Sequence, residues 1–334
     1  MSGDDLQSIS VICDDLDAAL RHYTEELGFE VDEVFPADLP RLVVVSQGDQ
    51  QVRLERASPA TPHAAQPASA SSIVTPATAG AWHAGRAGMA YRDLIPGRRQ
   101  GRVIASHIRI PDGGPVSDYV HYHHVAFQII FCVRGWVRVV YEDQGPSFVM
   151  EPGDCVLQPP QIRHRVLECS DGLEVVEISA PAEHRTIADR SLALPTDRLD
   201  RHRTYGGQRF VFHQASGAER VSGPTPGWET INTGISEATA GLGSVTVLRS
   251  ATSNQPLRLA AGDGLSFQFV LRGAGRLQAG GKRDRPLGPC DAFVVPQDED
   301  VLLTAGAAGM ELLRVTLSGA GQGARADSVS LLRE

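Results

Sequence analysis

Two histidine-containing stretches constrain most strongly what this chain can fold into. The first, Val120 to Gly135, reads VHYHHVAFQIIFCVRG, and the second, Pro152 to Glu168, reads PGDCVLQPPQIRHRVLE. Because successive side chains on a strand point to opposite faces, His121 and His123 would share one face, where two imidazoles can bind a single ion. His164 follows a turn rich in proline, so a third imidazole could reach the same point from an adjacent strand. The pattern predicts a metal site.

The spacing of both stretches resembles that of the cupin superfamily. The first cupin motif has the form HxH, four residues, Glu, six residues and Gly, and the second has Gly, Pro, Gly, His and Asn at fixed intervals. The corresponding residues here are His121, His123, Gln128 and Gly135, followed by Gly153, Pro159, Gln161, His164 and Glu168. The resemblance implies a jelly-roll barrel in which His121, His123 and His164 hold a metal. Gln128 stands where cupins usually place a carboxylate ligand.

Three neutral imidazoles favour divalent transition metals, so we expect one Fe, Ni, Zn, Cu or Mn ion per chain. Gln128 offers only a neutral carbonyl oxygen, which makes it a weak ligand or a neighbour of the ligands. His124 points away from His121 and His123 on a regular strand and is a second candidate for such a role.

Other polar residues near the motifs could orient a substrate. Tyr119, Tyr122 and Arg163 are the candidates, although each is equally compatible with a structural role. His184 follows the last expected strand of the barrel and is expected near its rim.

Length and charge narrow the classes of function. A chain of 334 residues is long enough for two or three domains, and its net charge of −9 gives no attraction for nucleic acid or for anionic membranes. The five cysteines are odd in number and scattered, which suits a reducing compartment. The N-terminal sequence MSGDDLQSIS lacks the basic start and apolar run of a secretory signal, so a cytoplasmic location is expected.

Residues 1–56 predict a small α+β module of one strand, a capped helix and further strands. The stretch DLDAALRHYTEELGFEV, Asp15 to Val31, resembles a half-module of the glyoxalase-like (vicinal oxygen chelate) proteins. In that family a histidine on the first strand often binds metal, and Ser8 occupies the matching position here. We therefore expect no metal site in this module.

The rest of the chain predicts a mainly β protein with two cupin jelly-roll barrels in tandem. Short strands between Gly/Pro turns indicate jelly rolls, and GLSFQFVLRGAGRL in the second half echoes AFQIIFCVRGWVRV in the first. The second copy lacks the histidines, so we expect it to hold no metal. The expected parts are an Ala/Ser/Pro-rich linker at 57–91, a metal-binding barrel at 92–190, a connector at 191–205, a degenerate barrel at 206–318 and a flexible tail at 319–334.

The strand at Phe127 to Val133 is apolar at nearly every position, so both of its faces should be covered, one by the barrel interior and the other by another domain or subunit. A glyoxalase-like half-module likewise needs a partner for one face of its sheet. Both needs favour a homodimer, and docking of the module onto a barrel of its own chain is the alternative.

Three functions are compatible with these features. The first is a metal-dependent oxygenase that acts on a small chelating phenol, enol or diketone, with gentisate-type dioxygenases as the closest analogy in layout. The second is a binding, sensing or storage bicupin without catalysis, and the third is an isomerase or lyase on the same fold. Fold alone does not choose among them.

Overall fold

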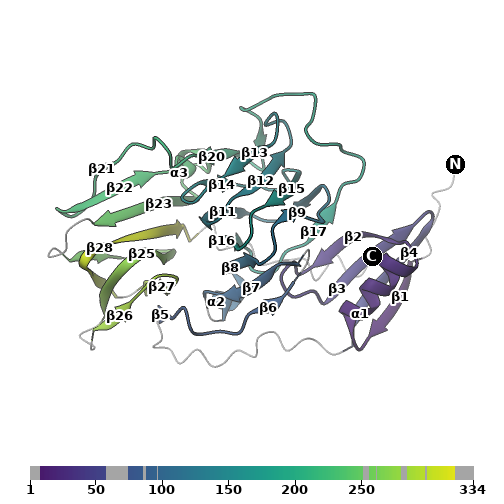
Figure 1. Ribbon diagram of the computed structural model, residues 1–334, viewed down its shortest axis with the longest axis horizontal. Helices are drawn as coiled ribbons and strands as arrows, with labels where there is room; N and C mark the ends of the chain where they lie inside the picture. The colour runs from purple at the N-terminus through teal and green to yellow at the C-terminus, as the bar shows by residue number, and fades with distance from the viewer. Residues whose placement is uncertain are drawn as a thin grey trace.

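The computed structural model of the protein describes residues 8–57, 74–85, 88–95, 97–250, 256–260, 262–279, 284–297 and 299–319. Residues 58–73 of the expected linker and nearly all of the expected tail (320–334) lie outside these residues. Figure 1 shows a small N-terminal module at the right, a first barrel in the centre and a second barrel at the left. None of the described helices is long and apolar enough to cross a membrane.

The N-terminal module packs one helical segment on a four-stranded sheet. Its elements are β1 (Ser8–Cys13), α1 (Leu16–Arg21), the π-helical turn η1 (His22–Glu26), β2 (Glu30–Phe35), β3 (Leu42–Gln47) and β4 (Gln50–Arg56). The Asp15 side chain caps α1 by accepting the Ala18 N–H at 2.9 Å. Gly48, with φ of 58°, turns β3 into β4, so the continuous strand expected up to Leu54 is a hairpin. The resemblance of this module to glyoxalase-like proteins stays a prediction.

The module continues a sheet of the first barrel. Strand β2 pairs antiparallel with β17 (Thr186–Ala188), with Thr186 opposite Val34. Next to this ladder, Arg41 forms a bidentate ion pair with Glu183 at 2.8 and 2.7 Å. The module is therefore docked onto a barrel of its own chain.

The first barrel consists of two facing sheets. One sheet runs β2-β17-β10-β15-β12-β13, with β9 paired to β15, and the other runs β20-β14-β11-β16-β8-β7-β6. The elements not yet bounded are β6 (His83–Ala84), β7 (Ala90–Asp93), α2 (Arg98–Gly101), β8 (Ile104–Ile110), β9 (Gly114–Pro115), β10 (His121–His123), β11 (Phe127–Arg134), β12 (Val137–Tyr141), β13 (Phe148–Met150), β14 (Cys155–Leu157), β15 (His164–Cys169), β16 (Leu173–Ala180) and β20 (Val211–His213). A separate hairpin follows, formed by β18 (Thr204–Tyr205) and β19 (Gln208–Arg209).

Strand parity on β11 and β16 separates the barrel interior from its outer face. Gln128 and Glu177 belong to the set that lines the interior, whereas Phe127 and Ile178 belong to the set that packs outward. Both sets are buried, so both faces of this sheet are covered.

The second barrel is built largely on two long strands, β25 (Leu265–Ala279) and β28 (Val301–Leu317). Its other elements are β21 (Val221–Ser222), β22 (Trp228–Asn232), α3 (Ile235–Ala238), β23 (Gly243–Ser250), β24 (Leu257–Leu259), β26 (Arg285–Leu287) and β27 (Ala292–Val294). The register of β25 shifts near Gly273, where φ is 76° and a Cβ would lie 2.2 Å from the carbonyl oxygen of Gly309. Glycine is therefore required at this bend.

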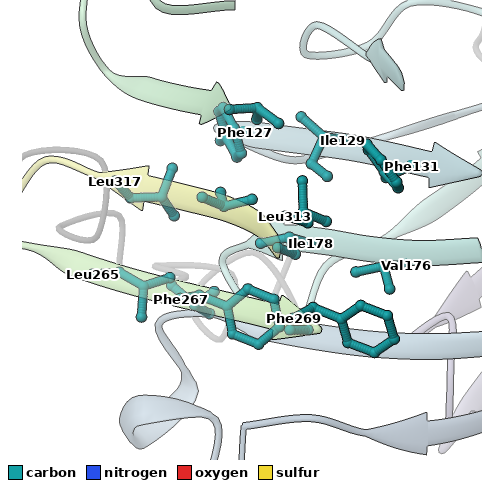
Figure 2. Packing of buried hydrophobic residues seen from close by; sticks show 14 of the residues in the cluster. Phe127, Ile129, Phe131, Val176, Ile178, Leu265, Phe267, Phe269, Leu313 and Leu317 are labelled. Atoms are coloured by element: carbon teal, nitrogen blue, oxygen red, sulfur yellow. The ribbon is translucent and has the colours of Figure 1, made fainter. Parts of the chain in front are cut away.

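One apolar cluster joins the two barrels. Phe127, Ile129 and Phe131 of β11 belong to the same cluster as Phe267 and Phe269 of β25, and Leu313 of β28 and Ile178 of β16 lie between these two rows in the view of Figure 2. The cover that the doubly apolar strand required thus comes from the second barrel of the same chain.

Each barrel also pairs with a short edge strand from outside its own expected segment. Strand β5 (Val74–Thr75), which precedes the first barrel, pairs with β27 of the second. Strand β20, which follows the first barrel and its connector, pairs with β14 of the first. The two barrels are therefore interlocked by hydrogen bonding as well as by their shared core.

Candidate functional site

Three histidine side chains converge on the inner face of the first barrel. His121 and His123 lie two residues apart on β10, and His164 at the start of β15 is directly opposite His121 in the register. One candidate ligand atom from each of the three lies within 4.8 Å of the others, and the exposed fractions of the residues are 0%, 6% and 5%. The structure thus brings together the three residues that the sequence pattern singled out.

Hydrogen bonds fix the tautomer of two of these imidazoles. The Nδ1–H of His121 donates to the Tyr119 carbonyl at 2.8 Å, and that of His164 donates to the Ile162 carbonyl at 3.0 Å. Each ring therefore carries its lone pair on Nε2. The Nδ1 of His123 lies 2.8 Å from the Thr186 hydroxyl, which orients that ring in the same way.

A buried carboxylate supports this cluster. One Asp118 oxygen lies 3.5 Å from the Nδ1 of His121, and the other accepts the Val166 N–H at 2.9 Å. A carboxylate beside a metal-binding imidazole raises its basicity and holds its orientation. Asp118 was not identified from the sequence, and its only signal there is its position three residues before His121.

The chemistry of these donors fits a divalent transition metal. Neutral imidazole nitrogens are ligands of borderline ions, and three of them leave coordination positions for other molecules. If an ion binds here, His121, His123 and His164 would hold it.

The histidines line a cavity of about 100 Å³ inside the barrel. Most of the wall is apolar, with Ile104, Ile108, Ile130, Val137 and Val139 among the lining residues. Tyr141 stacks on His164 with ring centroids 5.4 Å apart, and burial raises the pKa of its hydroxyl. Such a wall excludes bulk water from the polar groups that face the cavity.

A second group of polar residues lines the same cavity. Gln128 is 1% exposed; its Nε2 donates to Glu177 at 2.9 Å, and its Oε1 has no hydrogen-bond partner among the described residues. His184 donates from Nδ1 to the Pro181 carbonyl at 3.1 Å, and its buried Nε2 likewise has no partner there. Burial lowers the pKa of His184, which keeps the ring neutral.

The N-terminal module contributes to this cavity as well. Asp38, in the loop between β2 and β3, lines it and is 6% exposed. Arg98 holds the Asp38 carboxylate at 2.5 Å and also binds Asp93. Neither Asp38 nor Glu177 was identified from the sequence, because only long-range strand pairing brings them to the histidines.

The remaining sequence candidates lie outside the cavity lining. His124 is exposed and stacks on Tyr122, and burial together with the nearby Arg185 lowers its pKa. Arg163 stacks over the other candidate tyrosine, with 4.2 Å between the guanidinium carbon and the centroid of the Tyr122 ring, and binds Asp189. Tyr119 contacts His121 from outside through its carbonyl and ring edge. Strand alternation explains this placement, because Tyr122 and His124 have the opposite parity to the paired histidines.

The interior of the second barrel is apolar where the first has its histidines. Leu248, Val270, Leu277, Phe293 and Leu303 belong to the cluster that fills it.

A second group of potential ligands, His107, Glu174 and Cys290, lies where the barrels meet. The Nε2–H of His107 donates to Glu174 at 2.9 Å, and its Nδ1 accepts from Arg92 at 3.2 Å. Both ring nitrogens are thus in use, and Arg92 and Arg109 place positive charge beside them. The group fits a structural network better than a cation site.

Residues 106–179 match the family model described as "Cupin domain". This segment contains all three clustered histidines. The match covers most of the first barrel of this mainly β, jelly-roll chain.

Solved cupin structures share this fold at low sequence identity. They include oxalate decarboxylase from Bacillus subtilis, with a TM-score of 0.54 and 11% identity over 74% of this chain and 76% of that chain. The oxalate decarboxylase of Lactobacillus farciminis, solved as a formate complex, gives 0.55 and 11% over 75% and 87%. An 11S globulin from Wrightia tinctoria, described with an auxin binding site, gives 0.54 and 16% over 73% and 83%. No curated protein sequence matches the chain.

Proposed function

We propose that the cupin domain binds one divalent transition metal through His121, His123 and His164 and acts as a metal-dependent oxygenase on a small chelating substrate. The observation that carries this proposal is the convergence of three imidazoles, with their Nδ1 atoms held by hydrogen bonds, on one wall of an enclosed cavity. Fe, Ni, Zn, Cu and Mn are all compatible with these ligands.

The residues of the chain would prepare the reaction by position and by exclusion of water. A bound divalent metal supplies Lewis-acid polarisation of a substrate oxygen. Asp118 and Thr186 keep the imidazoles in place, and the apolar wall holds a small phenol, enol or diketone in one orientation. Tyr141 would limit the space above His164 by its stacked ring.

Binding without catalysis is the second candidate. An enclosed, mainly apolar cavity is also what a binding or sensing protein presents to a small ligand. An isomerase or lyase on the same site would need a proton-transferring group, for which Glu177 and His184 are available in the lining.

Metal analysis and oxygen uptake test the proposal together. We expect one metal ion per chain in the purified protein and oxygen consumption with a member of a catechol, gentisate and β-diketone panel, but no turnover without oxygen. Product formed equally under anaerobic conditions would indicate an isomerase or lyase, and ligand binding with no turnover would indicate a binding protein.

Replacement of His164 by alanine should remove most of the metal, because the two remaining imidazoles bind an ion more weakly than three. His124→Ala is the matched control, since this exposed histidine directly follows His121 and His123 but points to the opposite face. Full stoichiometric metal in the His164→Ala variant would refute the assigned ligands.

A further inference from the structure

The cavity contains a group of hydrogen-bond acceptors beside the three histidines, formed by Gln128, His184 and Glu177. We infer that this acceptor group selects a small uncharged ligand that carries a hydroxyl or amino donor next to its metal-binding oxygen, and that it disfavours carboxylate ligands. This inference rests on the proposed metal site for the position of the ligand, and it narrows the class of substrate.

The orientation of the Gln128 amide is fixed by its neighbour. Its Nε2 lies 2.9 Å from an oxygen of Glu177, which also accepts the Ser179 hydroxyl at 2.9 Å. A flipped amide would place two acceptors against each other, so the Nε2 must face Glu177. The carbonyl oxygen is then left inside the barrel, buried and without a partner among the described residues. An unpaired buried acceptor of this kind is destabilising, and a ligand that donates a hydrogen bond to it removes that cost.

His184 presents a second acceptor. Because its Nδ1–H donates to the Pro181 carbonyl, the lone pair is on Nε2, which is buried and unpartnered within the described structure. The His184 ring lies 5.4 Å from the ring of His123, measured between centroids. A ligand whose oxygen binds the metal at His123 would therefore place a donor on its adjacent atom close to the Nε2 of His184.

The charges in the lining point the same way. Glu177 and Asp38 are the acidic residues that face the cavity, and no lysine or arginine is among its described lining residues. Arg98 pairs with Asp38, whereas Glu177 accepts from the uncharged Gln128 amide and Ser179 hydroxyl. A carboxylate ligand would find a positive partner only in the metal and would face the Glu177 carboxylate. An uncharged ligand with a hydrogen-bond donor needs no positive partner and is not repelled by the acidic lining.

Size limits the ligand further. Pockets for drug-sized molecules have volumes of roughly 300–1,000 Å³, whereas this cavity has about 100 Å³. The ligand should therefore be small, with an apolar body to match the Ile and Val wall.

Three probes of similar size separate these possibilities: catechol, guaiacol and salicylate. Guaiacol replaces one hydroxyl donor of catechol with a methoxy group, and salicylate replaces it with a carboxylate. We expect catechol to bind about tenfold more tightly than guaiacol, as one good hydrogen bond implies, and salicylate to bind more weakly than catechol by at least that factor. Calorimetry under anaerobic conditions measures all three, on metal-loaded and on metal-free protein.

Substitutions test whether Gln128 and His184 cause the preference for catechol over guaiacol. Gln128→Met and His184→Phe should each weaken catechol binding about tenfold and leave guaiacol binding within about twofold. Gln268→Met is the matched control, because Gln268 is a buried glutamine at the equivalent position of the second barrel, also with an unpartnered Oε1 within the described structure, and should change neither. Circular dichroism and metal content are measured for every variant.

Salicylate binding as tight as that of catechol would overturn the inference, as would equal losses for catechol and guaiacol in both cavity variants. Loss of metal from Gln128→Met would also overturn it, because Gln128 would then be a metal ligand. If the binding order holds but no oxygen is consumed with any substrate, the inference stands and the oxygenase proposal fails.

Discussion

Two buried polar residues at or beside the cavity are held by hydrogen bonds and ion pairs. Gln128 donates to Glu177, and Asp118 lies beside His121 and accepts the Val166 N–H. In a buried site, removal of one partner leaves a polar group or a charge without compensation, which costs more than the interaction itself contributes. Substitutions at these positions therefore separate roles in metal binding from roles in stability.

Gln128→Glu should destabilise the metal-free protein and tighten metal binding. The new carboxylate would lie against Glu177 where an amide nitrogen now donates at 2.9 Å. We expect a loss of about 1–3 kcal/mol in the free energy of unfolding, measured by urea denaturation. A higher metal affinity is expected because the variant supplies the charge that the natural amide lacks.

A double variant that exchanges the two side chains is the control for this prediction. Adding Glu177→Gln to Gln128→Glu restores one donor and one carboxylate, so stability should return toward that of the natural protein. A Gln128→Glu protein as stable without metal as the natural one would contradict the expected repulsion.

Asp118→Asn should weaken metal binding without displacing the ligands. An amide cannot hold the His121 ring as a carboxylate does, and loss of such support typically costs 10–100-fold in affinity. Competition with a chelator measures the change, and Asp112→Asn in an exposed turn is the control. Equal affinities for the two variants would exclude this role for Asp118.

Among single residues, local spacing was sufficient for the histidines and insufficient for their surroundings. His121 and His123 share a strand, and the spacing of the second motif places His164 at the start of β15, opposite His121. Glu177 and Asp38 reach the cavity through the pairing of β11 with β16 and of β2 with β17, for which no local pattern exists. Tyr122 and Arg163 are close to the motif in sequence but face outward, so proximity alone misplaced them relative to the cavity.

At the level of elements, β11 separates the cavity from the contact between the barrels. Its uninterrupted apolar sequence predicted two covered faces, and the second barrel covers the outer one. The sequence left open whether another domain or another subunit would do so. Only the tertiary packing of the two barrels in one apolar cluster answers that question (Figure 2).

The contact between barrels is tight at Gly243 in β23. A Cβ at this position would lie 2.3 Å from a ring carbon of Phe127. We therefore expect Gly243→Ala to lower the free energy of unfolding by about 1–3 kcal/mol, as overpacking does in other cores. Thermal and urea unfolding measure this loss.

A smaller side chain opposite should relieve the strain. In the Gly243→Ala background, Phe127→Leu should be less destabilising than it is alone. Gly288→Ala is the control for the glycine itself, because its added methyl group would meet nothing within 4 Å. Additive effects of the two substitutions would contradict direct contact.

At the level of the whole molecule, the buried His107 network links the three parts of the chain that meet beside the barrel contact. Arg92 donates to His107, to the Pro76 carbonyl and to the Cys290 carbonyl, so one guanidinium joins the first barrel to the described part of the expected linker and to the second barrel. Trp82 packs over this network from outside.

The network should make stability depend on pH. Burial lowers the pKa of His107, and the hydrogen bond from His107 lowers the pKa of Glu174. The unfolded chain therefore binds protons more readily at both sites, so the free energy of unfolding should fall on acidification. The His107 contribution should be lost as pH falls below about 6.5, and the Glu174 contribution below about 4.3.

His107→Gln tests this prediction, because glutamine can still donate to Glu174 but does not titrate. Its stability should fall less steeply than that of the natural protein between pH 7.5 and pH 5.5, a range set by the ordinary histidine value of about 6.5. His202→Gln, at an exposed site, should leave the steepness unchanged. An unchanged slope in His107→Gln would show that other groups dominate the acid response.

A homodimer stays a prediction, and the structure moves its expected interface to the exposed edge strand β1. The module and the apolar strand of the first barrel both find cover within the chain, but β1 is an edge strand with Ile9 59% and Ile12 72% exposed. We expect light scattering to give a dimer at micromolar concentration and a monomer after replacement of both isoleucines by lysine. Val221→Lys on the second barrel is the control, and a monomeric natural protein would contradict the prediction.

The exchange of edge strands between the barrels has a consequence for synthesis on the ribosome. Strand β5 is among the first parts of the described barrels to emerge, yet its partner β27 is translated only near the end of the second barrel. The first barrel, for its part, lacks β20 until the connector has left the exit tunnel. The first barrel cannot complete its sheets until β20 is translated, and the second cannot until β27 is translated. A chain that stalls before β20 should therefore leave the first barrel incomplete and exposed to proteases.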